Sequence, residues 1–90
     1  MSDALIKNPA RFVATEIDDE TVVMSLDSGD FFSLTGTARS IWALLDGTRS
    51  RDAVLAVLAA DYGVAPAAIA GEVDAFLAEL TAAGLVRAAP

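Results

Sequence analysis

The fold is decided by residues 21–34, which read TVVMSLDSGDFFSL. Both ends of this stretch are rich in β-branched and aromatic residues with a period of two, which is typical of β-strands. Between them, residues 27–29 (DSG) form a turn sequence. The stretch therefore predicts a β-hairpin with strands over Thr21–Leu26 and Asp30–Leu34.

Two registers of this hairpin fit the sequence. A two-residue loop over residues 28–29 pairs Leu26 with Phe31. A three-residue loop over residues 27–29 places Gly29 at a left-handed position, where the absence of Cβ removes a steric penalty. We predict the three-residue loop because it puts four apolar side chains on one face and Phe31 on the other; the four are Val22, Met24, Phe32 and Leu34.

A further strand is predicted before the hairpin, over residues 12–17, with the polar turn 18–20 between them. Residues 1–11 show no period and contain a proline, so they are expected to form a flexible N-terminal arm. Because no linker or repeat interrupts the rest, residues 12–90 are predicted to form a single domain.

After the hairpin the apolar residues recur at helical spacing, which predicts three helices. Capping residues and glycines mark their ends. The order of three strands followed by three helices predicts an α+β fold with a three-stranded antiparallel sheet. The expected helix boundaries are Thr35 or Thr37 to residues 46–47, Ser50 to Gly63, and Pro66 to Gly84.

The composition argues against an enzyme. The 90-residue chain contains no cysteine and no histidine, which removes the usual Ser–His–Asp, Cys–His and zinc arrangements. The acidic residues at 18–20 and 27–30 lack the spacing of a calcium loop, and no phosphate-binding glycine loop is present. We therefore predict no catalytic residue, no metal and no cofactor.

The N-terminus lacks the basic and apolar regions of a signal peptide. No charge-free apolar run reaches the roughly 18 residues of a membrane span. These features predict a cytoplasmic protein that does not contact a membrane.

The net charge of −7 argues against nucleic acid as a partner. Residues 50–83 have the shape of a helix–turn–helix, which makes a winged-helix DNA-binding or transcription-associated domain the alternative function. However, the third predicted helix has no Lys, Arg, Asn or Gln, and it carries Glu72, Asp74 and Glu79. Such a helix reads DNA poorly, so a basic partner segment is expected instead.

One strand offers a place for a peptide to bind. The segment 30–34 has no lysine or proline to protect an exposed edge, so a partner strand can add to it. On the third helix, Leu77 widens the apolar stripe towards one flank, which can wall a groove; Glu72 and Glu79 lie on the other flank. Two simpler alternatives stay open: Phe32 and Leu34 belong to the core with Phe31 a lone surface aromatic, and Leu77 only widens a core stripe. The side of the helix that lines the groove also stays open.

Two segments of the chain resemble a known family. Residues 29–42, GDFFSLTGTARSIW, are similar to its pattern of glycine, aromatic pair, x-Leu-Asn-x-Thr, small residue, x-x-Ile-Trp. Residues 72–86 are similar to its closing Asp-Val-x-x-Phe-Leu-x-x-Leu and Gly-Leu-Val. The family is that of the PQQ-biosynthesis D protein and similar stand-alone recognition elements for ribosomally synthesised and modified peptides (RiPPs), including the B1 proteins of lasso-peptide clusters. The chain departs from it in having Thr35 for asparagine and Glu72 for aspartate.

The resemblance implies a winged helix–turn–helix that binds the leader of a precursor peptide. The leader adds as a strand beside residues 30–34, against the third helix, and is presented to a peptide-modifying enzyme or leader peptidase. Together with the edge and flank described above, this gives the expected peptide-binding residues: Asp30, Phe31, Phe32, Ser33, Leu34, Ala70, Val73, Asp74, Leu77 and Thr81.

Overall fold

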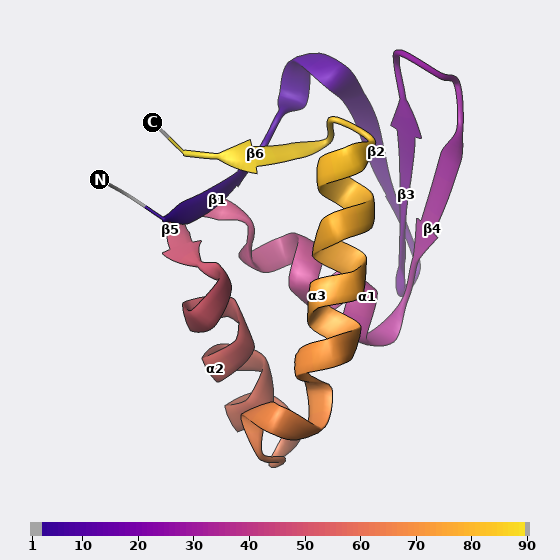
Figure 1. Cartoon of the computed structure of the whole chain (residues 1–90). Helices are drawn as coiled ribbons and strands as arrows, with labels where there is room; N and C mark the ends of the chain where they lie inside the picture. The colour runs from indigo at the N-terminus through magenta and orange to yellow at the C-terminus, as the bar shows by residue number, and fades with distance from the viewer. Residues whose placement is uncertain (1–2, 90) are drawn as a thin grey trace.

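Two three-stranded antiparallel sheets and three α-helices make up the fold in the computed structural model, which describes residues 3–89 (Figure 1). The predicted α+β class is confirmed, but a second sheet is present and its strands are interspersed with the helices. The elements are β1 (Ala4–Lys7), a 3-10 turn (Pro9–Arg11), β2 (Phe12–Ile17), β3 (Glu20–Ser25), β4 (Phe31–Leu34), α1 (Gly36–Leu44), β5 (Asp46–Ser50), α2 (Arg51–Tyr62), α3 (Pro66–Ala82) and β6 (Val86–Ala88).

The predicted strands form the sheet β2-β3-β4, with β4 at one edge. The hairpin register differs from the prediction by one residue. Val23 lies opposite Phe32, where Met24 was expected. The N–H of Ser25 donates to the carbonyl of Asp30 at 2.9 Å, so the loop has four residues, Leu26 to Gly29. Gly29 has a φ of 76°, as expected for a left-handed loop residue.

The change of register reverses which residues of β3 face the core. Thr21, Val23 and Ser25 are buried, whereas the predicted Val22 and Met24 are only half-buried. Burial of the two hydroxyls is compensated by hydrogen bonds. Thr21 Oγ1 donates to Glu16 Oε1 at 2.6 Å, and Ser25 Oγ accepts from the N–H of Ser28 at 3.3 Å. The apolar alternation was therefore misleading in this strand because two polar residues occupy inward positions.

The second sheet has the order β5-β1-β6 and pairs strands from near both ends of the described chain, residues 3–89 (Figure 1). Leu5 of β1 lies opposite Arg49 on one side and Ala88 on the other. The N–H of Lys7 donates to the carbonyl of Leu45 at 3.2 Å, and that of Asn8 to Leu85 at 2.8 Å. The expected arm over residues 1–11 thus contains the central strand of a sheet; its first two residues lie outside the described range.

Local sequence explains where the helices begin and end. Ser50 caps α2, because its Oγ accepts a hydrogen bond from the N–H of Ala53 at 3.2 Å. Gly63 follows α2 with a φ of 66°, a conformation that lacks a steric penalty only for glycine. Pro66 occupies the first turn of α3, where its missing N–H is not needed. The three predicted helices are confirmed, and α1 begins after Thr35.

The core lies between the helices and the inner faces of both sheets. Trp42 of α1 is 5% exposed and meets Phe12 edge to face, with ring centroids 5.0 Å apart. Leu85 and Val86 return to this core after α3, as predicted. Within residues 3–89, no helix has the length and apolar character needed to cross a membrane. The buried apolar cluster consists of Val23, Leu34, Ile41, Trp42, Leu45, Val54, Leu55, Leu58, Val73, Leu77, Leu80, Leu85 and Val86.

Candidate peptide-docking site

Strand β4 has one side free for a further strand. It pairs with β3 on one side and is the last strand of its sheet. Its side chains alternate between the two faces: Leu34 is buried and Phe32 half-buried, whereas Phe31 is 69% exposed and Ser33 is exposed. The preceding Asp30 is also exposed. The predictions that Phe31 points outward and that Phe32 and Leu34 point inward are therefore confirmed.

The backbone of β4 supplies the groups that pair with a further strand. In an antiparallel ladder, hydrogen-bonded and non-hydrogen-bonded pairs alternate along the strands. Ser25 and Asp30 are hydrogen-bonded, which makes Val23 and Phe32 the next hydrogen-bonded pair. The N–H and C=O groups of Phe31 and Ser33 consequently point away from β3. We call these outward groups the β4 edge.

A groove lies between α1 and α3. Its cavity volume is about 400 Å³. Helix α1 starts two residues after β4, so its side chains that line the groove, Ala38 and Ile41, lie in the first two turns after that strand. The lining combines apolar side chains with two carboxylates, from Ala38, Ile41, Glu72, Ala75, Phe76 and Glu79. This α1–α3 groove can therefore hold an apolar side chain beside a basic one.

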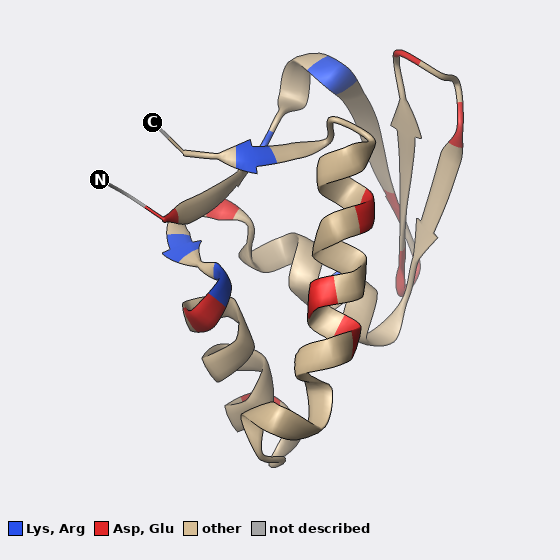
Figure 2. Ribbon diagram, in the orientation of Figure 1, with Lys and Arg blue, Asp and Glu red and all other residues tan. Residues whose placement is uncertain are grey.

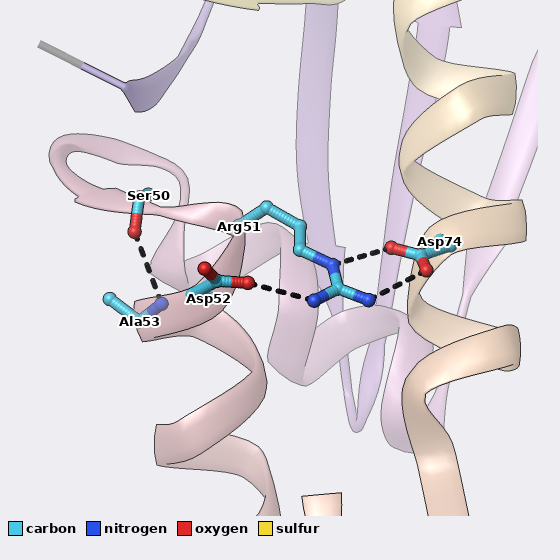
Figure 3. A network of polar contacts seen from close by, with 5 residues as sticks. All are labelled: Ser50, Arg51, Asp52, Ala53 and Asp74. Atoms are coloured by element: carbon cyan, nitrogen blue, oxygen red, sulfur yellow. Dashed lines mark hydrogen bonds and ion pairs between the residues drawn. The ribbon is translucent and has the colours of Figure 1, made fainter. Parts of the chain in front are cut away.

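The opposite flank of α3 faces α2. The guanidinium of Arg51 donates from Nε and Nη2 to the two carboxylate oxygens of Asp74, both at 2.7 Å (Figure 3). Its Nη1 donates to Asp52 at 2.8 Å. The hydrogen bonds from Arg51 lower the pKa of Asp74 below its ordinary value. Asp74 is therefore occupied by a partner within the chain.

The predicted flank of α3 does not line the groove. At about 100° per residue, Leu77 lies about 140° around the helix from Glu72. Leu77 is 8% exposed and Val73 is fully buried, so both belong to the core. Thr81 is exposed and its hydroxyl donates to the carbonyl of Leu77 at 2.8 Å. Asp74 lies on the side of α3 that faces α2, and half-buried Ala70 shares its flank. None of the five predicted α3 residues therefore lines the groove.

The groove residues of α3 that the prediction missed carry a recognisable signal. Glu72 and Glu79 are seven residues apart, and Phe76 lies between them, so all three share one flank of the helix. Phe76 is half-buried, in contrast to the fully buried Val73 of the same apolar stripe. An aromatic residue at the margin of the stripe, between two carboxylates, distinguishes this flank from the one carrying Leu77.

A second cavity, of about 360 Å³, lies where α1 meets the two sheets. Its polar groups largely satisfy one another. Glu16 accepts hydrogen bonds from Thr21 at 2.6 Å and from Arg39 at 2.9 Å, and these bonds lower the pKa of Glu16. Lys7 places its Nζ 5.3 Å from the centroid of the Trp42 ring, and burial lowers its pKa. Since this cavity is internally paired, the α1–α3 groove is the better candidate for ligand binding.

Charge is distributed unevenly over the fold. Figure 2 shows acidic residues along α3 and at the turns of the sheet β2-β3-β4, while basic residues gather around β5, the start of α2 and β6, with a further one where β2 begins. No group of three or more acidic side chains suited to a metal ion occurs among residues 3–89. The groove side of the molecule is therefore negatively charged and favours a ligand with basic residues.

Comparison with known proteins identifies a family and a similar solved structure. The family described as coenzyme PQQ synthesis protein D (PqqD) matches residues 20–86. A solved structure described as TbiB1 in complex with the TbiA(beta) leader peptide is similar to this chain, with a TM-score of 0.78 and 26% sequence identity. The alignment covers 91% of this chain and 94% of that one. No curated protein matches the chain.

Proposed function

The chain belongs to the family of coenzyme PQQ synthesis protein D, and we propose that it acts as a RiPP recognition element. In this role it binds the leader of a ribosomal precursor peptide. It then delivers the peptide to a modifying enzyme or leader peptidase. The similar structure of TbiB1 with a bound leader peptide supports the class of ligand.

The observation that carries the proposal is the open β4 edge close to the α1–α3 groove. A leader in extended form adds to β4 as a fourth strand and bonds to the outward N–H and C=O groups of Phe31 and Ser33. Main-chain bonds of this kind give affinity with little dependence on sequence. Side chains of the leader that reach the groove give specificity, because they contact Phe76 and the carboxylates of Glu72 and Glu79.

The fold is used as a winged helix–turn–helix for peptide recognition. Helices α2 and α3 form the helix–turn–helix, and the hairpin β3–β4 serves as the wing. In a DNA-binding domain of this kind, α3 would carry basic side chains. Here α3 is acidic and its open flank holds a groove, which favours a peptide as the ligand. The role is binding rather than catalysis, because the chain has no histidine or cysteine and the groove offers only carboxylates.

The test is a titration with the leader of the precursor peptide, followed by NMR. We expect the amide resonances of residues 31–34 and of the groove flank of α3 to shift together. Asp61 at the far end of α2 serves as an internal reference whose amide stays unmoved. If saturating leader moves other amides and leaves residues 31–34 in place, the peptide does not add to β4 and the proposal is wrong.

A further inference from the structure

The sheet β2-β3-β4 has an exposed apolar face that neither the core nor the proposed leader site uses. Val23 and Phe32 face the core, so their neighbours along each strand face outward. Register places Val13, Met24 and Phe31 side by side across the three strands. We define the outer face as this row together with the residues on the same side of β2 and β3; its apolar members are Val13, Ile17, Val22, Met24 and Phe31.

The exposure of this face is high for such large side chains. Val13 is 50% exposed, Ile17 53% and Phe31 69%. Of the six large apolar residues that are exposed among residues 3–89, four lie in this sheet or its β3–β4 loop. Single exposed apolar residues are ordinary, but a contiguous patch on one face is typical of a protein–protein interface.

Acidic residues border the outer face at both ends. The β2–β3 turn carries Asp18 and Asp19, with Glu20 beside them. The β3–β4 loop carries Asp27 and Asp30, but Asp27 forms an ion pair with Arg11, which directly precedes β2. Glu16 lies on the opposite face of β2 and pairs with Arg39, so the acidic border consists mainly of residues 18–20 at one end and Asp30 at the other. Strands of six residues separate the two acidic ends by roughly 20 Å.

The charge of the outer face indicates which kind of protein can bind to it. Two copies of the chain meeting through this face would bring carboxylates together, which disfavours a homodimer. A protein with an apolar patch and a group of Lys or Arg that faces the β2–β3 turn complements the face in charge.

We propose that the outer face docks the enzyme that processes the leader-bound precursor. This inference rests on the proposed function, since it names the surface that the delivery step uses. Phe31 belongs to both regions: its backbone lies on the β4 edge and its side chain lies on the outer face. An enzyme docked on this face therefore contacts the adaptor next to the strand position of the leader, without occupying the α1–α3 groove.

The test compares three variants of the full chain, each titrated with the purified processing enzyme and, separately, with the leader peptide. Val13→Lys/Ile17→Lys removes two apolar contacts and adds charges that repel a basic partner. Val13→Glu/Ile17→Glu removes the same two apolar contacts but adds negative charges, which attract a basic partner. Val64→Lys is the control, because Val64 is 41% exposed in the turn between α2 and α3, outside the outer face.

We expect the double lysine variant to weaken enzyme binding at least about ten-fold, equivalent to roughly 1.4 kcal/mol. The double glutamate variant should weaken it less, and Val64→Lys should leave it unchanged. Chemical denaturation of each variant checks that it is folded, and leader affinity should match that of the parent protein in all three.

Each other outcome has a distinct meaning. Unchanged enzyme affinity in both double variants, with leader binding intact, overturns the inference and leaves the proposed function standing. A parent protein that binds no leader overturns the proposed function. A parent protein that dimerises in sedimentation, and becomes monomeric on Val13→Lys/Ile17→Lys, shows that a second copy covers the face and also overturns the inference.

Discussion

Arg51 of α2 holds Asp74 of α3 through two parallel hydrogen bonds, each 2.7 Å long. A bidentate pair of this kind fixes orientation as well as distance. The pair lies on the flank of α3 that faces α2, whereas the flank of Glu72, Phe76 and Glu79 lines the groove. The rotation of α3 about its axis decides which side chains a leader can reach.

The first prediction separates the two flanks. Leu77→Ala should destabilise the fold by about 2–5 kcal/mol, because Leu77 is buried, and should leave leader affinity unchanged. Phe76→Ala should weaken leader binding by about ten-fold, equivalent to roughly 1.4 kcal/mol. Urea denaturation and leader titration on both variants make the comparison. A Leu77→Ala protein that stays stable but loses leader affinity would restore the flank that the sequence favoured.

A second prediction concerns the backbone of β4. Ser33→Pro removes an N–H that points away from β3 and takes no part in the β3–β4 ladder. Phe32→Pro removes an N–H that donates to β3 within this ladder. Ser33→Pro should therefore keep most of the stability and lose one hydrogen bond to the leader, about 1 kcal/mol or five-fold in affinity. Phe32→Pro should destabilise the hairpin itself. Equal leader affinity for Ser33→Pro and the parent would mean that the leader does not pair with this edge.

The third prediction tests the carboxylates of the groove. Glu72→Gln/Glu79→Gln should lower the affinity for a leader with basic residues and make the remaining affinity less dependent on salt, because exposed charges are screened over about 10 Å at 0.1 M salt. The control, Asp18→Asn/Asp19→Asn, removes the same charge from the distant β2–β3 turn. If both variants lose affinity equally, only the net charge matters and the groove has no special role.

Substitutions of Asp30 and Asp74 by lysine should have different effects. Asp30 is exposed next to the β4 edge, so Asp30→Lys should weaken binding of a leader with basic residues. Asp74 bonds to Arg51, so Asp74→Lys would place two cations together and act on the contact between α2 and α3. Its effect should appear in stability rather than in leader affinity.

The fourth prediction is a dependence of stability on pH. Since Arg51 lowers the pKa of Asp74 in the folded state, the pair contributes its full stabilisation only above the pKa that Asp74 has in the unfolded chain. This contribution is lost as the pH falls through the lower, folded pKa. The stability difference between the parent and Asp74→Asn should therefore be present at neutral pH and shrink in acid. Denaturation series at several pH values measure it, with Asp61→Asn as the control; a difference that is constant with pH contradicts the assignment.

Local sequence signals predicted much of the fold. Strand β2 has the predicted bounds, and Ser50, Gly63 and Pro66 mark helix ends as expected, because capping and left-handed turns depend on neighbouring residues. Strands β1 and β5 were missed because each is short and lacks an alternating pattern: β5 reads DGTRS. Their pairing joins segments about forty residues apart, and no local signal encodes such a contact.

Only the part of the candidate site that depends on local sequence could be predicted. The alternation of Phe31 and Phe32 is a local property, and the β4 edge followed from it. The flank of α3 that faces the groove depends on how α3 packs against α2, which includes the contact from Arg51, more than twenty residues away in the chain. Leu77 and Phe76 are both apolar neighbours on one helix, and only the packing of α2 against α3 decides which of them is buried.

The sheet β5-β1-β6 holds the first and last strands of the described chain side by side. The N–H of Ala89 donates to the carbonyl of Ala4 at 2.8 Å, so the two ends of the described chain are adjacent. A short flexible linker can then join them with little loss of entropy. New ends can be opened in the exposed α2–α3 turn around Val64, away from both the groove and the outer face. Such a circular permutant should fold and keep its ligand, and it provides a way to attach the adaptor to another protein from a different side.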